Sequence, residues 1–285
     1  QLFKRKGAEI KEADAMMRGD DFWNQYRQVP LTETESSMDL LVKRLEQMPG
    51  FKYVIFVLKA FIENFVETGT KEHPSKVDIG PINTMISSNY IDGMRLRASA
   101  QTTANLNPHL FFKGYYAYGF KDHRSKGMAE VEYSFNKKEY LPREFPKNSI
   151  TGTFLYDVMA PTDKFLKTDK DNVFTSFKTT TVDQMMYVRN IAMKYERETE
   201  WGFKTTVEVK NTNDEPTGNL VYIKNDDART VVSDITTTEA SLTLRNAPGE
   251  TFINTKQRRI PVSFDAPVFT LSHTAGFKGV LGGDY

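Results

Sequence analysis

A period of two dominates the chain from about residue 90 onward, and this alternation limits the possible folds more than any other feature. In residues 94–101 every even position is apolar and every odd position is polar, with the small Ala98 and Ala100 continuing the series. Residues 110–121 and 129–136 alternate in a similar way, and polar, turn-like segments connect the three runs. Successive side chains of a strand point to opposite faces, so the pattern predicts a three-stranded antiparallel meander with one apolar and one polar face.

The same period continues less regularly to the end of the chain. It predicts further strands at residues 150–158, 185–195, 203–210, 220–224, 240–245, 260–264 and 268–273. The total is about nine or ten strands by period-two counting. No helical pattern alternates with them, which disfavours a parallel α/β sheet. The predicted fold class is therefore mainly β, built as an antiparallel meander.

Residues 1–89 follow a different pattern and are predicted to form a polar N-terminal and helical segment. Ser36 and Asp39 resemble a capping box at a helix start, apolar residues follow at helical spacing to Met48, and Pro49-Gly50 end that helix. A second helix is expected from Tyr53 through Phe65. Residues 90–285 form the predicted β portion. The first residues carry no apolar run of a signal peptide, so the chain is expected to be either cytoplasmic or a mature or internal piece.

Strands with one apolar and one charged face have two physical interpretations. In a soluble sheet the apolar face is the core, whereas in a membrane barrel it contacts lipid and the charged face lines the lumen. Residues 90–101 and 110–121 are long enough to cross a bilayer, which takes about 9–11 tilted residues. Connections alternate between short (122–127) and long (136–148, 161–172), as in barrels. Aromatic residues lie near strand ends on the apolar face: Tyr116, Tyr118, Phe120, Tyr133 and Phe135.

Composition excludes several classes of function. The 38 Lys and Arg residues almost balance the 37 Asp and Glu residues. The net charge of the chain therefore gives no reason to expect a nucleic-acid partner. There are no cysteines, so disulfides, thiolate metal sites and cysteine nucleophiles are excluded. The four histidines lack close metal-ligand spacing, and no phosphate loop or nucleophile elbow occurs. We expect no catalytic residues, no cofactor and no metal.

In the barrel interpretation, the charges of the polar face are candidate lumen-facing residues that tune solute selectivity. The simpler alternative is that they pair across strands and solvate that face. These charges are Arg95, Arg97, Lys113, Glu130, Glu132, Lys204, Glu208 and Lys210.

Several segments resemble a family of Bacteroidetes outer-membrane β-barrel proteins of unknown function. They include Phe22-Trp23, Pro30-Leu31-Thr32 and Gly80-Pro81, and above all residues 89–97 and the Gly-Tyr-Tyr-Ala-Tyr-Gly-Phe-Lys-Asp run at 114–122. Full-length members of that family usually carry a signal peptide and an N-terminal carboxypeptidase-regulatory-like domain. Asp92 departs from the pattern, in which glutamate is more common before the glycine.

The resemblance implies a partial transmembrane β-barrel in the cell outer membrane, preceded by a short helical segment. Its role would be structural or transport-related and non-catalytic, and its partners would be the lipid bilayer and the outer-membrane assembly machinery. The chain would be an internal piece of a longer protein. The alternative is a soluble antiparallel β protein that binds a ligand or partner, with residues 36–66 as a helical cover.

Overall fold

The computed structural model describes residues 2–3, 44, 48, 50–70, 72–165, 182–225, 227–254, 259–262 and 267–284. Contacts divide the chain into one unit of Gln1–Lys6 with Glu63–Tyr285 and a second unit of Gly7–Ile62. Most of the helix predicted at residues 36–48 lies outside the described residues, within which Arg44 is helical, and the Phe22-Trp23 segment lies outside them entirely.

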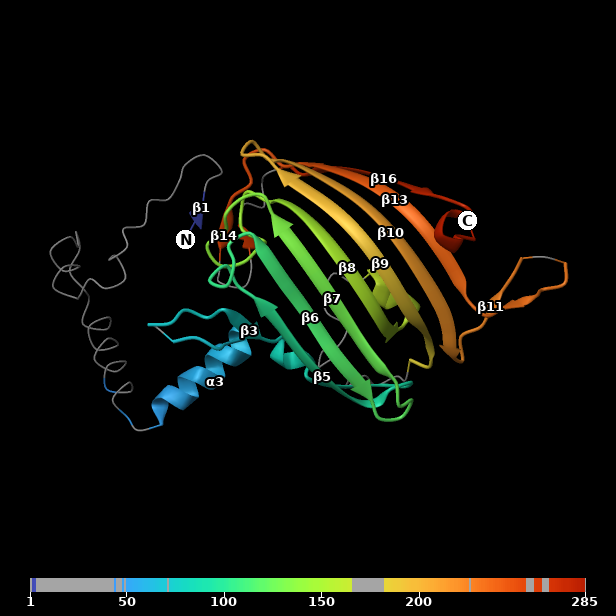
Figure 1. The fold of residues 1–285 in the computed structure, drawn as a ribbon, viewed down its shortest axis with the longest axis horizontal. Helices are drawn as coiled ribbons and strands as arrows, with labels where there is room; N and C mark the ends of the chain where they lie inside the picture. Colours follow the sequence, from blue (N-terminus) through green and yellow to red (C-terminus); the bar gives the residue numbers. More distant parts are fainter. Residues whose placement is uncertain are drawn as a thin grey trace. The chain divides into compact units, whose positions relative to one another are not determined.

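An antiparallel meander of long strands makes up most of the first unit. These strands are β5 (Gly93–Thr102), β6 (Leu110–Gly119), β7 (Ser125–Ser134), β8 (Asn148–Met159), β9 (Gln184–Glu198), β10 (Phe203–Gly218), β13 (Ile235–Asn246) and β16 (Phe269–Gly276). Each pairs antiparallel with the next in this order. Figure 1 shows them side by side in one curved sheet. The mainly β, antiparallel meander class predicted from the alternation is confirmed.

Short strands complete the architecture. The far side of β5 carries β3 (Val77–Ile79) and β4 (Ile86–Asn89), and β2 (Val66–Glu67) pairs with β3. The sheet thus begins before the predicted boundary at residue 90. A small separate sheet joins β1 (Leu2–Phe3), β14 (Phe252–Asn254) and β15 (Arg259–Pro261), and β11 (Tyr222–Ile223) pairs with β12 (Val231–Val232). Within the described residues, 3₁₀ turns lie at Ile82–Thr84, Pro161–Phe165 and Val280–Gly282.

The sheet stays open over the part of the chain that is described. Its strand order ends at β16 on one side and at β2 on the other, and these two strands do not pair. The connections also differ from prediction. The long segments 136–148 and 161–172 follow β7 and β8 respectively, and consecutive connections of a meander leave opposite ends of the sheet. Two long connections therefore follow one another, so the alternation of short and long connections expected from the sequence does not hold for this pair.

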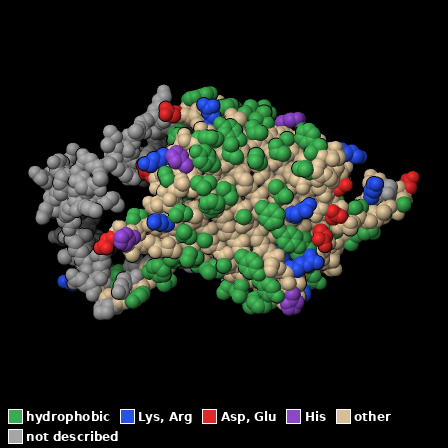
Figure 2. Space-filling model, in the orientation of Figure 1, with side chains coloured by type: hydrophobic (Ala, Val, Ile, Leu, Met, Phe, Trp, Pro, Cys, Tyr) green, Lys and Arg blue, Asp and Glu red, His purple; other side chains and the backbone are tan. Residues whose placement is uncertain are grey.

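Register assigns side chains to two faces with opposite chemistry, because directly paired residues of antiparallel strands point to the same side. One paired row reads Tyr133, Ile150, Tyr195, Val207 and Leu242 across five strands. We call this side the apolar face, and Figure 2 shows its hydrophobic side chains spread over the long strands. The opposite side is the polar face.

Burial on the two faces is inverted relative to a soluble sheet. On the apolar face Tyr116 is 57% exposed, Ile191 52% and Met193 65%. On the polar face Gln101, Glu132, Thr151 and Glu196 are buried. Over these rows the sheet buries polar side chains and exposes apolar ones. Apolar side chains are buried at the end of β8 and the start of β9, in two small clusters: Val158, Met185 and Tyr187, and Met159, Met186 and Val188.

Helix α3 spans Phe51–Glu63 in the second unit and reaches one residue into the first. The predicted helix ran through Phe65, but Asn64 adopts a left-handed conformation with φ 62°, which ends the helical hydrogen-bonding pattern. Among the described residues, no helix combines the length and the apolar character needed to span a membrane.

Candidate functional site on the polar face

The eight charges predicted to line a lumen all lie on the polar face. Lys113 pairs directly with Glu130, and the same row continues through Thr153 and Ala192 to Lys210. Glu132, Lys204 and Glu208 lie an even number of residues from members of this row on the same strands, and so share that side. Gln101 of β5 pairs with Lys113, and Arg95 and Arg97 lie an even number of residues from Gln101, so they share it too. The alternation in the sequence therefore assigned these eight residues to one face of the sheet, as the structure does.

Five of the eight have charged or aromatic partners. Glu132 contacts Lys147, Lys204 contacts Glu196, and Lys210 contacts Glu239. Arg95 joins the buried network described below, and the Arg97 guanidinium lies 3.7 Å from the centre of the Tyr115 ring. By contrast, Lys113, Glu130 and Glu208 form no ion pair or side-chain hydrogen bond within the described part of the chain.

A group of five charged side chains, here called the buried ionic network, lies where β5, β7 and β8 approach the β6–β7 turn. Its members are Asp92, Arg95, Asp122, Lys126 and Asp157. Arg95 donates to Asp157 through both terminal nitrogens, at 2.7 and 2.9 Å, and to Asp92 at 3.0 Å. Lys126 contacts Asp92 and, at 2.6 Å, Asp122. Charged groups this deeply buried are tolerated because each has opposite charges and hydrogen bonds around it.

Two tyrosines extend the network. The Tyr115 hydroxyl donates to Asp157 at 2.5 Å, and the Tyr187 hydroxyl donates to Asp122 at 2.8 Å. Burial alone would raise the pKa of Asp122, but hydrogen bonds from Lys126 and Tyr187 outweigh this effect and lower it. Asp122 therefore stays ionised and holds the β6–β7 turn against the sheet.

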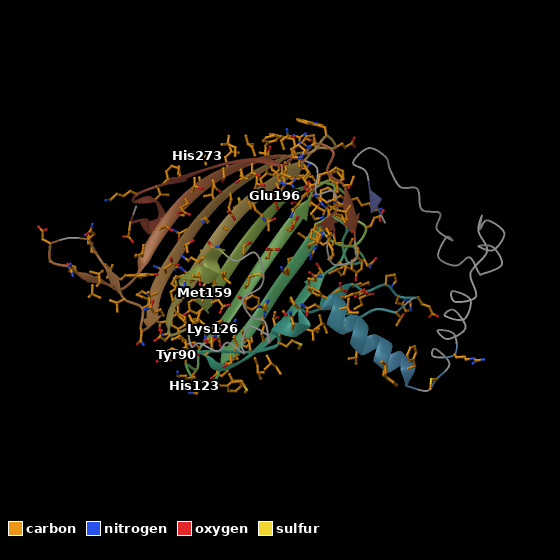
Figure 3. The ribbon with its side chains drawn as sticks, turned by 180° about the vertical axis from the view of Figure 1, so that it is seen from behind. Tyr90, His123, Lys126, Met159, Glu196 and His273 are labelled. Atoms are coloured by element: carbon orange, nitrogen blue, oxygen red, sulfur yellow. The ribbon has the colours of Figure 1, made fainter. Side chains whose placement is uncertain are left out.

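A second group of charges lies toward the opposite end of the polar face. The Lys147 ammonium bridges Glu196 at 2.8 Å and Glu132 at 3.3 Å, and Lys204 also reaches Glu196 at 2.7 Å. Burial alone would lower the pKa of Lys147, but the two carboxylates outweigh it and raise that pKa. Figure 3 shows the structure from behind, with Glu196 on β9 and Lys126 on β7 labelled.

The connection between β7 and β8 is fixed by two of its own side chains. The Glu144 carboxylate accepts hydrogen bonds from the backbone N–H groups of Glu139, Tyr140 and Leu141. The Lys138 ammonium donates to the backbone carbonyls of Glu144 and Pro146, at 2.6 and 2.8 Å. Burial lowers the pKa of Lys138 to about 8. These bonds give the connection a defined conformation, although it has no regular secondary structure.

The histidines take part in no metal centre over the described ranges. No three His, Asp or Glu side chains there are arranged to hold a metal ion. His109 contacts the Ser134 carbonyl through Nδ1 at 2.9 Å, while His73 and His273 are exposed. Asp163, in the connection after β8, accepts a hydrogen bond from the Ala160 backbone N–H.

Alternation did not identify the buried ionic network as a unit. Asp92 and Asp122 lie in turns, and Lys126 belongs to a segment expected to be a turn rather than the start of β7. Arg95 and Asp157 are 62 positions apart. Their proximity depends on the meander register, which periodicity alone does not specify.

Comparison with known proteins places the chain by family only. No curated protein and no solved structure matches it. A family model described as the C-terminal domain of a family of unknown function, DUF5686, matches residues 61–285. The match covers the whole meander, and the chain belongs to this family.

Proposed function

We propose that the meander is part of the wall of a transmembrane β-barrel in the outer membrane of the cell, with its apolar face against lipid. Its role is structural or transport-related and involves no catalysis. The single observation that carries this proposal is the inverted burial of the sheet. A soluble sheet would bury the apolar face and expose the polar one.

The extent of the apolar face supports lipid as its neighbour. Exposed apolar side chains recur on every long strand, whereas exposed apolar patches on soluble monomers rarely exceed a few hundred Å². They are Leu96, Phe112, Tyr116, Val131, Tyr133, Ile150, Phe154, Ile191, Met193, Val207, Val209, Leu242 and Leu271. Burying them in hydrocarbon is favourable at roughly 25 cal/mol per Å².

Strand length fits the same environment. Strands β5, β6 and β7 have 10 residues each, β8 has 12 and β9 has 15. Crossing a bilayer takes about 9–11 tilted residues, whereas strands of soluble proteins centre on about 5–6. The two open edges require further strands or partners within lipid, because unpaired backbone groups are costly there. The outer-membrane assembly machinery is the partner that this proposal implies.

Adjacent cysteines on opposite faces test the proposal, because the chain has no cysteine of its own. We would label Phe112→Cys and Ile191→Cys on the apolar face with an environment-sensitive fluorophore. Lys113→Cys and Asn190→Cys, one position away, are the matched controls. In phosphatidylcholine vesicles, nitroxide lipids should quench the first pair and aqueous iodide the second. Equal iodide quenching at all four positions would exclude lipid contact and favour the soluble alternative.

A further inference from the structure

A pocket of about 190 Å³ opens on the polar face between the first strands of the meander and the β7–β8 connection. We call it the β5–β7 pocket. Its walls come from β5, β6 and β7 and from Leu141, Pro142 and Arg143 of the connection. Sites for drug-sized ligands are larger, about 300–1,000 Å³. The β5–β7 pocket is therefore of a size for a small solute.

One part of the lining is apolar. It comes from Phe111, Leu141 and Pro142. Pro142 is partly exposed, whereas Phe111 and Leu141 are packed against the protein and are only 3% and 1% exposed. The Glu144 and Lys138 hydrogen bonds hold this part of the connection in place. A preformed apolar surface favours a ligand with a compact aliphatic or aromatic group, because little ordering is needed on binding.

The remaining lining supplies one cation and one carboxylate that have no partner in the described part of the protein. Lys113 and Glu130 are directly opposite on β6 and β7, and both line the pocket. They make no ion pair with each other, and neither makes one elsewhere among the described residues. The other charged lining groups are engaged: Glu132 contacts Lys147, and Arg143 donates to Gln101 at 3.5 Å.

From these features we propose that the β5–β7 pocket binds a small zwitterion with an apolar side chain, the chemical class of the α-amino acids. Lys113 binds the ligand carboxylate, Glu130 binds its ammonium group, and the side chain lies against Pro142 and the edges of Phe111 and Leu141 that line the pocket. Charge-assisted hydrogen bonds of this kind are stronger than neutral ones. The inference goes beyond the proposed barrel and does not depend on whether the apolar face contacts lipid.

Three probes of nearly equal shape test the requirement for both charges. They are L-leucine, 4-methylpentanoate, which lacks the ammonium group, and 3-methylbutylamine, which lacks the carboxylate. Each would be titrated calorimetrically into the full chain in detergent micelles. We expect L-leucine to bind at least about tenfold more tightly than either analogue, since each analogue loses one charge-assisted contact. Equal affinity for all three, or no binding of L-leucine, would overturn the proposal whatever the outcome of the lipid experiment.

Charge-neutral variants then assign each contact. Lys113→Gln should lose the preference for L-leucine over the amine but keep the preference over the acid, and Glu130→Gln should do the reverse. Glu208→Gln is the matched control, because Glu208 lies on the polar face outside the pocket and has no partner in the described chain. If Glu208→Gln changes the affinities as much as the pocket variants do, the effect is general electrostatics and the assignment fails. The three probes on the unmodified chain remain decisive should a variant not fold.

Discussion

Arg95 and Asp157 form a doubly hydrogen-bonded ion pair between β5 and β8, and both side chains are fully buried. The two residues are 62 positions apart in the sequence, and strands β6 and β7 lie between β5 and β8 in the sheet. The pair thus spans several strands on the polar face. It links the start of β5 to the end of β8 more directly than the backbone hydrogen bonds do.

Removing one member of this pair should be strongly destabilising. We expect Arg95→Met to lower the free energy of unfolding by about 3–5 kcal/mol, because Asp157 stays buried with its charge uncompensated. Urea unfolding followed by tryptophan fluorescence measures this change. The control is Lys210→Met, since Lys210 and Glu239 form a pair whose side chains are 37% and 31% exposed. It should cost under about 1 kcal/mol. Similar losses from both variants would show that burial of the Arg95–Asp157 pair does not determine the size of the destabilisation.

Gly119 is required because two carboxylates of the buried ionic network approach it. A Cβ atom at this position would lie 2.6 Å from Oδ1 of Asp92 and also too close to Asp122. We expect Gly119→Ala to lower the free energy of unfolding by about 1–3 kcal/mol, the usual cost of overpacking. Gly152→Ala is the control, because nothing lies within 4 Å of its added Cβ. Thermal unfolding of both variants checks the prediction. A melting temperature of Gly119→Ala equal to or above that of the unmodified chain would contradict it.

Much of the sheet could be predicted from sequence because the long strands repeat a period of two over ten or more residues. The same period assigned Lys113 and Glu130 to one face. Strands β2, β3 and β4 escaped prediction because segments of two to four residues are too short to show a period. The buried ionic network and the β5–β7 pocket could not be predicted from the sequence either. They depend on register between distant strands and on the path of a connection without regular structure.

Lys138 makes the stability of the β7–β8 connection depend on pH. Its pKa is lowered to about 8 in the folded protein, so between pH 8 and its ordinary value the unfolded chain binds more protons than the folded one. Stability therefore rises with pH across this window and is lost as pH falls through about 8. The free energy of unfolding rises by an amount on the order of 1–3 kcal/mol across this window. Unfolding measured from pH 7.5 upward should show a smaller rise for Lys138→Met. Parallel profiles for the two proteins would contradict the assignment to Lys138.

A charge on the apolar face distinguishes lipid from water as the neighbour of that face. Ile191 is 52% exposed near the middle of β9 and pairs with Phe154 and Asn211. In a bilayer, Ile191→Arg should lower the free energy of unfolding by about 2–4 kcal/mol, because an arginine near the midplane loses its hydration. At a water-exposed position the same change should stay within about 0.5 kcal/mol. Urea unfolding from phosphatidylcholine vesicles measures the difference. Asn190→Arg, one residue away on the polar face, is the control and should cost less than Ile191→Arg. The reverse order would place lipid on the wrong side of the sheet and refute the proposed barrel wall.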